Sequence, residues 1–188
     1  MSLPRIAVPL FALFIAACAS PSSGLQPFES GTSRVGLAAN ITSVDAEADS
    51  GGTSERNTFD ASLNWGRFVA PKVELGFTTG ISSAEQDGAE SDLATLGGYG
   101  RFYFNSDAAV RPYVGLDLGG LAGSSDAFDV SGSFFNVNAG FMTFFNSNVA
   151  LDTRITRGWT SQDFDDGVVT DTVTTDAVAV VVGLSFFY

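Results

Sequence analysis

The sequence predicts an all-β protein, an eight-stranded antiparallel up-and-down transmembrane β-barrel that follows a cleaved signal peptide. From residue 33 onward, apolar side chains alternate with small polar ones, which is the period-two pattern of strands with one apolar face. The composition includes 21 glycines and 17 phenylalanines but only 16% charged residues, whereas a soluble domain usually carries about 25%. After the signal, the longest apolar run is 177–184, too short for the ~20 residues that a membrane-spanning helix needs.

Residues 1–19 have the three parts of a secretory signal peptide. A short first segment carries Arg5, an apolar stretch covers 6–17, and small residues follow. Residues 20–32 are rich in Ser, Pro and Gly, so we expect them to form a flexible tether. The barrel is then expected to cover residues 33–188.

Two processing sites are compatible with the end of the signal. A cut after Ala19 fits the small residues that precede signal-peptidase sites. The segment 15–18, with the sequence IAAC, also resembles a bacterial lipobox, in which the cysteine is cut free and acylated. Cys18 is the single cysteine of the chain and lies at the position that acylation would use. Both alternatives therefore remain open.

Eight alternating segments are expected, separated by residues typical of turns. In chain order they cover 34–44, 57–68, 72–83, 93–104, 112–122, 133–145, 149–160 and 173–188. One face of each is apolar: Val35, Leu37, Ala39 and Ile41; Phe59, Ala61, Leu63 and Trp65; Val73, Leu75, Phe77 and Ile81; Leu96, Phe102 and Phe104; Val114, Leu116 and Leu118; Phe135, Val137, Ala139 and Phe141; Val149, Leu151 and Ile155; Val178, Val180, Val182, Leu184, Phe186 and Tyr188. The fourth segment has the weakest pattern, because glycines replace two of its apolar positions.

The connections between these segments alternate in length. Short ones are expected at 69–71, 105–111 and 146–148, and long ones at 45–56, 84–92, 123–132 and 161–172. Most of the 21 acidic residues lie in or beside the long connections, whereas Lys72 and Arg111 lie on the short side. Short turns on one side and longer, acidic loops on the other are typical of an outer-membrane barrel.

The composition of the polar face distinguishes a membrane barrel from a soluble β-sandwich. A soluble sheet presents Lys and Glu to water on its polar face. Here that face carries Gly, Ser, Thr and Asn, which suits a narrow lumen, while the apolar face meets lipid. Aromatic residues such as Trp65, Phe104 and Trp159 lie near segment ends, where the interfacial girdles of such barrels belong.

Four stretches of the sequence resemble a known family, the small eight-stranded outer-membrane β-barrels that include the transmembrane domain of outer-membrane protein A and related surface barrels. They are WGRFVAPKVELG at 65–76, GRFYF at 100–104, RPYVG at 111–115 and VGLSFFY at 182–188. The resemblance implies insertion into the outer membrane of a Gram-negative-type bacterium, with membrane lipid and the barrel-assembly machinery as partners. It also implies a carboxy-terminal assembly signal at Leu184, Phe186 and Tyr188, although Phe is the usual last residue of that signal. We do not expect the peptidoglycan-binding domain of some family members.

Composition excludes several functions. The chain has no histidine, so the His-dependent mechanisms of barrel lipases, acyltransferases and proteases cannot be assembled, and we expect no enzyme. With one cysteine and no histidine, neither a metal site nor a cofactor is expected. A formal net charge of −12 makes nucleic acid an improbable partner.

Charged residues on the polar face are expected to form a network that fills the lumen, because unpaired charges there would be costly. The network comprises Glu74, Arg101, Asp117, Asp152 and Arg154, with Arg101 as the expected partner of Glu74. This favours a monomeric, non-enzymatic outer-membrane protein with acidic extracellular loops and a role in envelope structure or surface interaction. A narrow porin-like channel for small solutes is the alternative.

Mass spectrometry of the mature protein distinguishes the two processing sites. If the segment 15–18 is a lipobox, the mature chain begins at an acylated Cys18 and gains a second membrane anchor. A free amino terminus at Ser20 would show instead that Cys18 leaves with the signal peptide.

Overall fold

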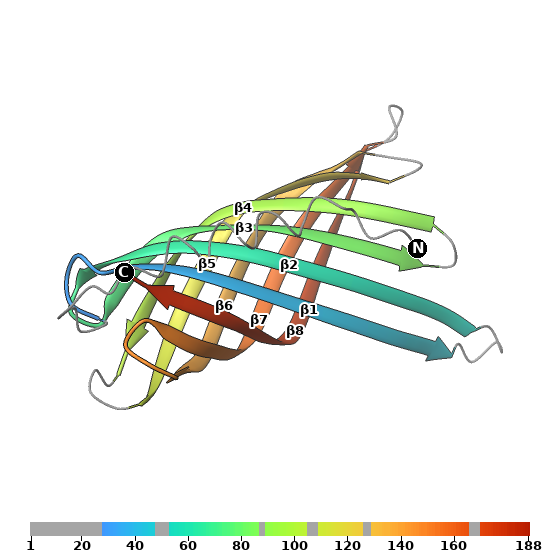
Figure 1. Ribbon diagram of the computed structural model, residues 1–188. Coiled ribbons are helices and arrows are strands. Elements are labelled where there is room, and N and C mark those ends of the chain that lie inside the picture. The colour runs from blue at the N-terminus through green and yellow to red at the C-terminus, as the bar shows by residue number, and fades with distance from the viewer. Residues whose placement is uncertain (1–27, 48–52, 87–88, 105–108, 126–128, 166–169) are drawn as a thin grey trace, which may run out of the picture.

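The computed structural model describes residues 28–47, 53–86, 89–104, 109–125, 129–165 and 170–188, which form eight strands (Figure 1). They are β1 (Ser33–Glu47), β2 (Thr53–Ala70), β3 (Val73–Gln86), β4 (Ala89–Tyr103), β5 (Val110–Ser125), β6 (Asp129–Phe144), β7 (Val149–Asp165) and β8 (Thr170–Phe187). In the part of the chain described, no helix is long and apolar enough to cross a membrane.

Every strand pairs antiparallel with its neighbours in sequence, and β1 pairs with β8 to close the barrel. The predicted fold class is therefore confirmed. Because the number of strands is even, both ends of the barrel chain lie at one end, where Ser33 and Tyr188 exchange two backbone hydrogen bonds of 2.9 and 3.0 Å. We call this the terminal end and the opposite one the far end.

The alternation of inward and outward side chains follows the predicted phase. On β3, Leu75 and Phe77 are 51% and 64% exposed on the outer face. Glu74, which directly precedes Leu75, is fully buried. The large exposed apolar side chains belong to strands β2 to β8 and form the surface that faces lipid in a membrane barrel.

The predicted long connections are wrong in extent, because the strands continue through most of them. For example, β3 ends at Gln86 and β4 begins at Ala89. The strands have 14 to 18 residues, more than the 9–11 that are needed to cross a bilayer. Beyond the lipid both faces of a strand meet water, so the contrast between apolar and polar positions disappears although the backbone hydrogen bonds continue. The sequence pattern therefore cannot show where these strands end.

Residues 28–32, which we expected to belong to the flexible tether, pack against the terminal end of the barrel. Phe28 is buried, with a positive φ of 85°. The N–H of Gly31 donates to the carbonyl of Phe68 over 2.8 Å, and the N–H of Phe68 donates to the carbonyl of Thr32 over 2.9 Å. The prediction of a tether is therefore wrong for these five positions. Phe28 occupies an apolar site, and the surrounding Ser, Pro and Gly residues form no pattern that indicates it. Residues 1–27, with the predicted signal, lie outside the described residues.

The seam between β1 and β8 is shorter than the other strand pairings. Its register runs from Arg34 opposite Phe187 to Ala39 opposite Val182 and stops there. Among the described residues, β1 continues from Asn40 paired with β2 alone, and β8 from Thr170 to Val181 paired with β7 alone. In Figure 1 the two strands diverge toward the far end. The barrel is thus closed by hydrogen bonds only in its terminal half.

Two glycines face each other across β4 and β5 where the strands approach closely. A Cβ on Gly119 would overlap the carbonyl oxygen of Leu96 and lie 2.6 Å from the Cα of Gly97. By contrast, a Cβ on Gly120, which points outward, would find the carbonyl oxygen of Gly132 at 3.6 Å as its near neighbour.

Replacing Gly119 by Ala is expected to lower the free energy of unfolding by about 1–3 kcal/mol, the usual effect of overpacking. Urea unfolding in lipid vesicles measures the effect. The adjacent Gly120→Ala is the matched control and is expected to leave the stability close to that of the wild type. Equal effects of the two substitutions would contradict the close packing of β4 and β5.

Candidate functional site

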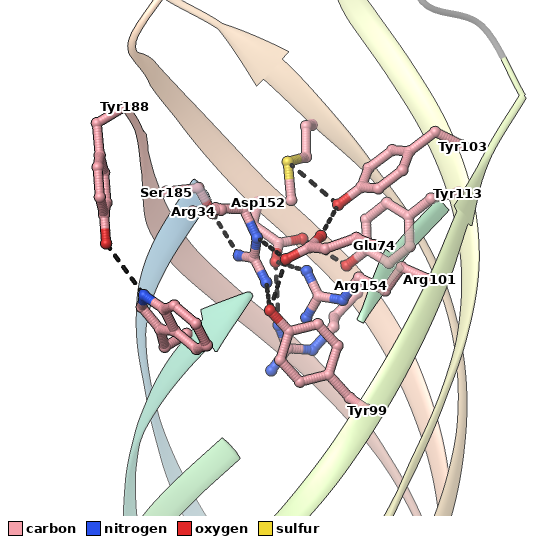
Figure 2. Close-up of polar contacts among 12 residues, drawn as sticks. Arg34, Glu74, Tyr99, Arg101, Tyr103, Tyr113, Asp152, Arg154, Ser185 and Tyr188 are labelled. Atoms are coloured by element: carbon pink, nitrogen blue, oxygen red, sulfur yellow. Dashed lines mark hydrogen bonds and ion pairs between the residues drawn. The ribbon is translucent and has the colours of Figure 1, made fainter. Parts of the chain in front are cut away.

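A buried ion pair lies in the lumen between β1 and β3. The guanidinium Nε of Arg34 donates to Oε1 of Glu74 over 2.7 Å, and neither side chain is exposed. Arg34 also donates to Oγ of Ser185 over 2.9 Å and to the hydroxyl of Tyr99 over 3.0 Å. Two tyrosine hydroxyls complete the shell of the carboxylate, because Tyr99 donates to Oε1 over 2.5 Å and Tyr103 donates to Oε2 over 2.6 Å (Figure 2).

A second buried carboxylate, Asp152 of β7, lies in the same cross-section of the lumen. Arg101 and Arg154 donate to its Oδ2 over 3.2 and 3.0 Å. The hydroxyl of Tyr113 donates to Oδ1 over 2.6 Å. The two carboxylates therefore have the same kind of environment, with a guanidinium group and a tyrosine hydroxyl at each.

Arg101 joins the two groups. Its guanidinium carbon lies 5.1 Å from the ring centroid of Tyr99 and 4.9 Å from that of Tyr113, so the cation lies between two aromatic faces. Figure 2 shows these side chains converging from strands on opposite sides of the lumen. Hydrogen bonds, ion pairs and cation–π contacts thus connect β1, β3, β4, β5, β7 and β8 through one network.

An aromatic cluster fills the lumen on the terminal side of these charges. The ring of Phe28 lies with its centroid 4.7 Å from that of Phe68, 4.3 Å from that of Tyr103 and 5.8 Å from that of Phe187. The guanidinium of Arg111 covers the Phe28 ring at 4.4 Å. We call this cluster the aromatic floor, and its members named here other than Arg111 are all buried.

The predicted network is partly rearranged in the structure. Glu74, Arg101, Asp152 and Arg154 do come together in the lumen, but the expected direct partner of Glu74 is wrong. Arg34 forms that ion pair, and Arg101 binds Asp152 instead. Asp117 takes part in none of the ion pairs among the described residues and accepts a hydrogen bond from Asn138 over 3.0 Å.

Sequence reasoning missed Arg34 although the signal was present. Arg34 occupies the polar phase of the first segment, so its side chain had to point into the lumen near the terminal end. Glu74 lies two strands away, and the length of an arginine side chain spans that distance across a narrow barrel. Pairing by neighbouring strands alone favoured Arg101, which is directly opposite Glu74 in the register.

Of the predicted assembly-signal residues, Leu184 and Phe186 lie on the outer face of β8, and Tyr188 directly follows its last residue. Leu184 and Tyr188 are exposed and Phe186 is partly exposed. The hydroxyl of Tyr188 accepts a hydrogen bond of 3.0 Å from the indole nitrogen of Trp65. Whether these residues act as an assembly signal stays a prediction, and Cys18 lies outside the described residues.

A family model for the outer membrane protein beta-barrel domain matches residues 10–186. The chain belongs to this outer-membrane β-barrel family. Its location is accordingly the outer membrane of a Gram-negative-type envelope. A comparison with curated proteins gave no significant match.

Solved structures with the same fold include small outer-membrane barrels. Neisserial surface protein A is 16% identical, with a TM-score of 0.59 over 85% of this chain and 98% of its own. The outer-membrane protein OprG of Pseudomonas aeruginosa is 13% identical, with a TM-score of 0.58 over 87% and 99%. AlkL, determined in lipid bilayers, is 14% identical, with a TM-score of 0.54 over 90% and 95%. At these identities the likeness shows the fold.

Replacing Glu74 by Gln is expected to lower the free energy of unfolding by about 3–5 kcal/mol, because it leaves the buried Arg34 cation without a counter-charge. Denaturant unfolding in lipid vesicles measures this loss. Asp176→Asn is the matched control, since it removes one carboxylate from an exposed ion pair with Arg157, and we expect little change. Similar effects of both substitutions would argue against the dependence of the barrel on the buried pair.

Proposed function

We propose that the protein is a non-enzymatic, sealed outer-membrane barrel that serves envelope structure or surface interaction rather than solute passage. The observation that carries the proposal is the double closure of the lumen. The charged network spans the cross-section, and the aromatic floor lies behind it. An eight-stranded barrel has an interior just wide enough for side chains to fill, so these layers leave no room for a wide aqueous pore.

Electrostatics favours a permanently closed network. Each of the two buried carboxylates lies within hydrogen-bonding distance of guanidinium groups, Glu74 of Arg34 and Asp152 of Arg101 and Arg154. In an interior of low dielectric constant such contacts are strong, and separating them would leave buried charges without partners. Solute passage through the terminal half would require breaking several of them at once.

The far end supports a surface role. Acidic residues lie on strand segments that extend beyond the length needed to cross lipid, among them Asp45, Glu47, Glu85, Asp129 and Asp163. The resemblance to outer-membrane surface barrels favours an outward orientation of this end, with the terminal end in the periplasm. We propose outer-membrane lipid and the barrel-assembly machinery as partners, and a monomeric state.

Planar-bilayer recordings test the sealed lumen. The wild-type protein is expected to show no large steady conductance. The double variant Arg34→Ala with Glu74→Ala removes one buried pair without leaving an unpaired ion, and it is expected to raise the conductance. The exposed pair provides the matched control, Arg157→Ala with Asp176→Ala. A large, stable wild-type conductance would overturn the proposal and favour a channel for small solutes.

Replacing Tyr188 by Asp is expected to lower the amount of folded barrel in the outer membrane severalfold. The substitution places a charge on the lipid-facing side of the closing strand. Tyr188→Phe removes only the hydroxyl that accepts the Trp65 hydrogen bond, so it should retain near-normal levels. Heat-modifiable mobility on gels of outer-membrane fractions reports the folded amount. Normal levels for Tyr188→Asp would exclude an assembly role for this residue.

A further inference from the structure

A groove of about 950 Å³ lies on the outer face of the barrel, over β3, β4 and β5. Gly98 and Gly100 of β4 lie along it. In the register, Gly98 is opposite Phe77 of β3 on one side and Leu118 of β5 on the other. Phe77 and Leu118 are 64% and 61% exposed and point outward, so Gly98 between them faces outward as well. The groove is therefore a hollow in the lipid-facing surface, with large apolar side chains on both sides of two glycines.

Close packing of the strands does not require glycine at position 98. A Cβ built on Gly98 would find the carbonyl oxygen of Gly76 at 3.7 Å as its near neighbour, which is an ordinary contact. A Cβ on the adjacent Gly97, which faces the lumen, would instead overlap the carbonyl oxygen of Leu118. The missing side chain at position 98 thus leaves space on the membrane side. The volume of the groove is at the upper end of the ~300–1,000 Å³ of sites that hold small molecules.

One end of the groove lies at the level of the membrane–water interface. Trp65 of β2 lines it, with its ring 6.4 Å from that of Phe77. The indole nitrogen of Trp65 donates to the hydroxyl of Tyr188 at the terminal end of the barrel. Trp and Tyr side chains lie at the level of the lipid head groups in membrane proteins, because one part of each ring is apolar and the other polar. A chain in the groove would therefore have its head group at the terminal end.

Two cationic residues lie beside this end of the groove. Arg67 of β2 is exposed and is opposite Leu75, an outward residue that lines the groove. A Cβ built on Gly31 would lie 3.8 Å from Nη2 of Arg67, so the guanidinium extends toward the terminal end. A long arginine side chain in a membrane wall directs its charge to the interface in this way. Lys72 directly precedes Val73, which also lines the groove.

These cations are available to a ligand of opposite charge. Arg67 and Lys72 take part in none of the ion pairs among the residues that the structure describes. Lys72 is also the single lysine of a chain whose formal net charge is −12. A cation at a membrane surface attracts the negative charge of anionic lipids, by roughly fivefold in affinity for each Lys or Arg.

We propose that the groove binds one anionic phospholipid, with an acyl chain along Gly98 and Gly100 and the phosphate beside Arg67 and Lys72. The apolar lining matches the chain, and the cations match the head group. A second copy of the barrel is a poorer occupant. Two copies related by a twofold axis would bring the same cations of both chains together, and like charges across an interface are costly.

The site deepens the proposed function, because it names a class of lipid partner. It rests on that proposal for one point, the assignment of the terminal end to the periplasmic side, which would place the bound lipid in the periplasmic leaflet. The two proposals fail in different measurements. A conducting lumen would appear in planar-bilayer recordings, whereas the lipid site is tested by fluorescence in vesicles. Vesicles that carry the same lipids in both leaflets make that test independent of orientation.

The two tryptophans of the chain provide a reporter and a reference. Trp65 lines the groove, whereas Trp159 of β7 lies outside it and stacks on Phe135. The experiment uses the full protein in phosphatidylcholine vesicles with increasing amounts of phosphatidylglycerol brominated on its acyl chains, which quenches nearby tryptophan. Trp159→Phe leaves Trp65 as the reporter, and Trp65→Phe leaves Trp159. Quenching of Trp65 is expected to reach half its maximum at a mole fraction about tenfold lower than that of Trp159.

Filling the groove tests the place of the acyl chain. In the Trp159→Phe protein, Gly98→Leu is expected to raise the mole fraction for half-maximal quenching of Trp65 to that of the bulk lipid. Gly120→Leu is the matched control, because Gly120 also points outward but does not line the groove. It should leave the strong quenching of Trp65 unchanged.

Removing the cations tests the head group. Arg67→Gln with Lys72→Gln is expected to lower the preference for brominated phosphatidylglycerol over brominated phosphatidylcholine about tenfold. Arg157→Gln, which alters an exposed arginine on β7, is the matched control and should keep the preference. The groove-filling and charge variants change different parts of the site, so the test stands even if one of them folds poorly.

Four outcomes would overturn the proposal. Quenching of Trp65 and Trp159 at the same mole fractions would show only bulk lipid at the groove. Unchanged quenching in Gly98→Leu would place the lipid elsewhere. Equal quenching by the two brominated lipids in the wild-type groove would exclude selection of an anionic head group. Weak quenching of Trp65 by both lipids, together with a dimer in analytical ultracentrifugation, would assign the groove to a second copy of the chain.

Discussion

The carboxylate of Glu74 is the group on which the interior of the barrel depends. It has no exposure to water, and its ionised form is satisfied by Arg34, Tyr99 and Tyr103 from two other strands. Because Arg34 also reaches Ser185 of β8, the same contact fixes the closing strand against the rest of the barrel. The second carboxylate, the cation between two tyrosine rings and the aromatic floor all surround this centre. The interior is thus arranged around a charge that the fold cannot leave unpaired.

The two halves of the barrel differ in how their walls are held together. In the terminal half, side chains cross the lumen and the β1–β8 seam is hydrogen-bonded. In the far half the seam separates, and β8 carries apolar residues on both faces. The terminal half is therefore closed by side-chain contacts across the lumen as well as by the pairing of its strands.

Much of the fold could be predicted from the sequence because of one rule: every second residue of a membrane-spanning strand faces lipid and is apolar. The positions of the eight strands and the inward or outward phase of residues such as Leu75 and Glu74 follow from that rule. The ends of the strands do not, because beyond the membrane both faces meet water and the rule no longer applies. Phe28 could not be predicted either, since a single aromatic residue in a Ser- and Pro-rich segment shows no period. The charged residues of the lumen were identified by their inward-facing positions. Their partners depend on distances across the barrel, which the spacing of residues along the chain does not give.

The hydrogen bond between Arg34 and Ser185 joins residues 151 positions apart in the chain. The central charge network therefore cannot be completed while β1 and β8 are separate, however well the six strands between them are paired. Contacts of such long sequence separation form late, because the loop they close carries a large entropic penalty. A chain that has paired only its local hairpins has an open sheet with Glu74 in contact with solvent. Closure of the ring and neutralisation of its interior are then a single cooperative event, so partly closed barrels should be short-lived rather than stable intermediates.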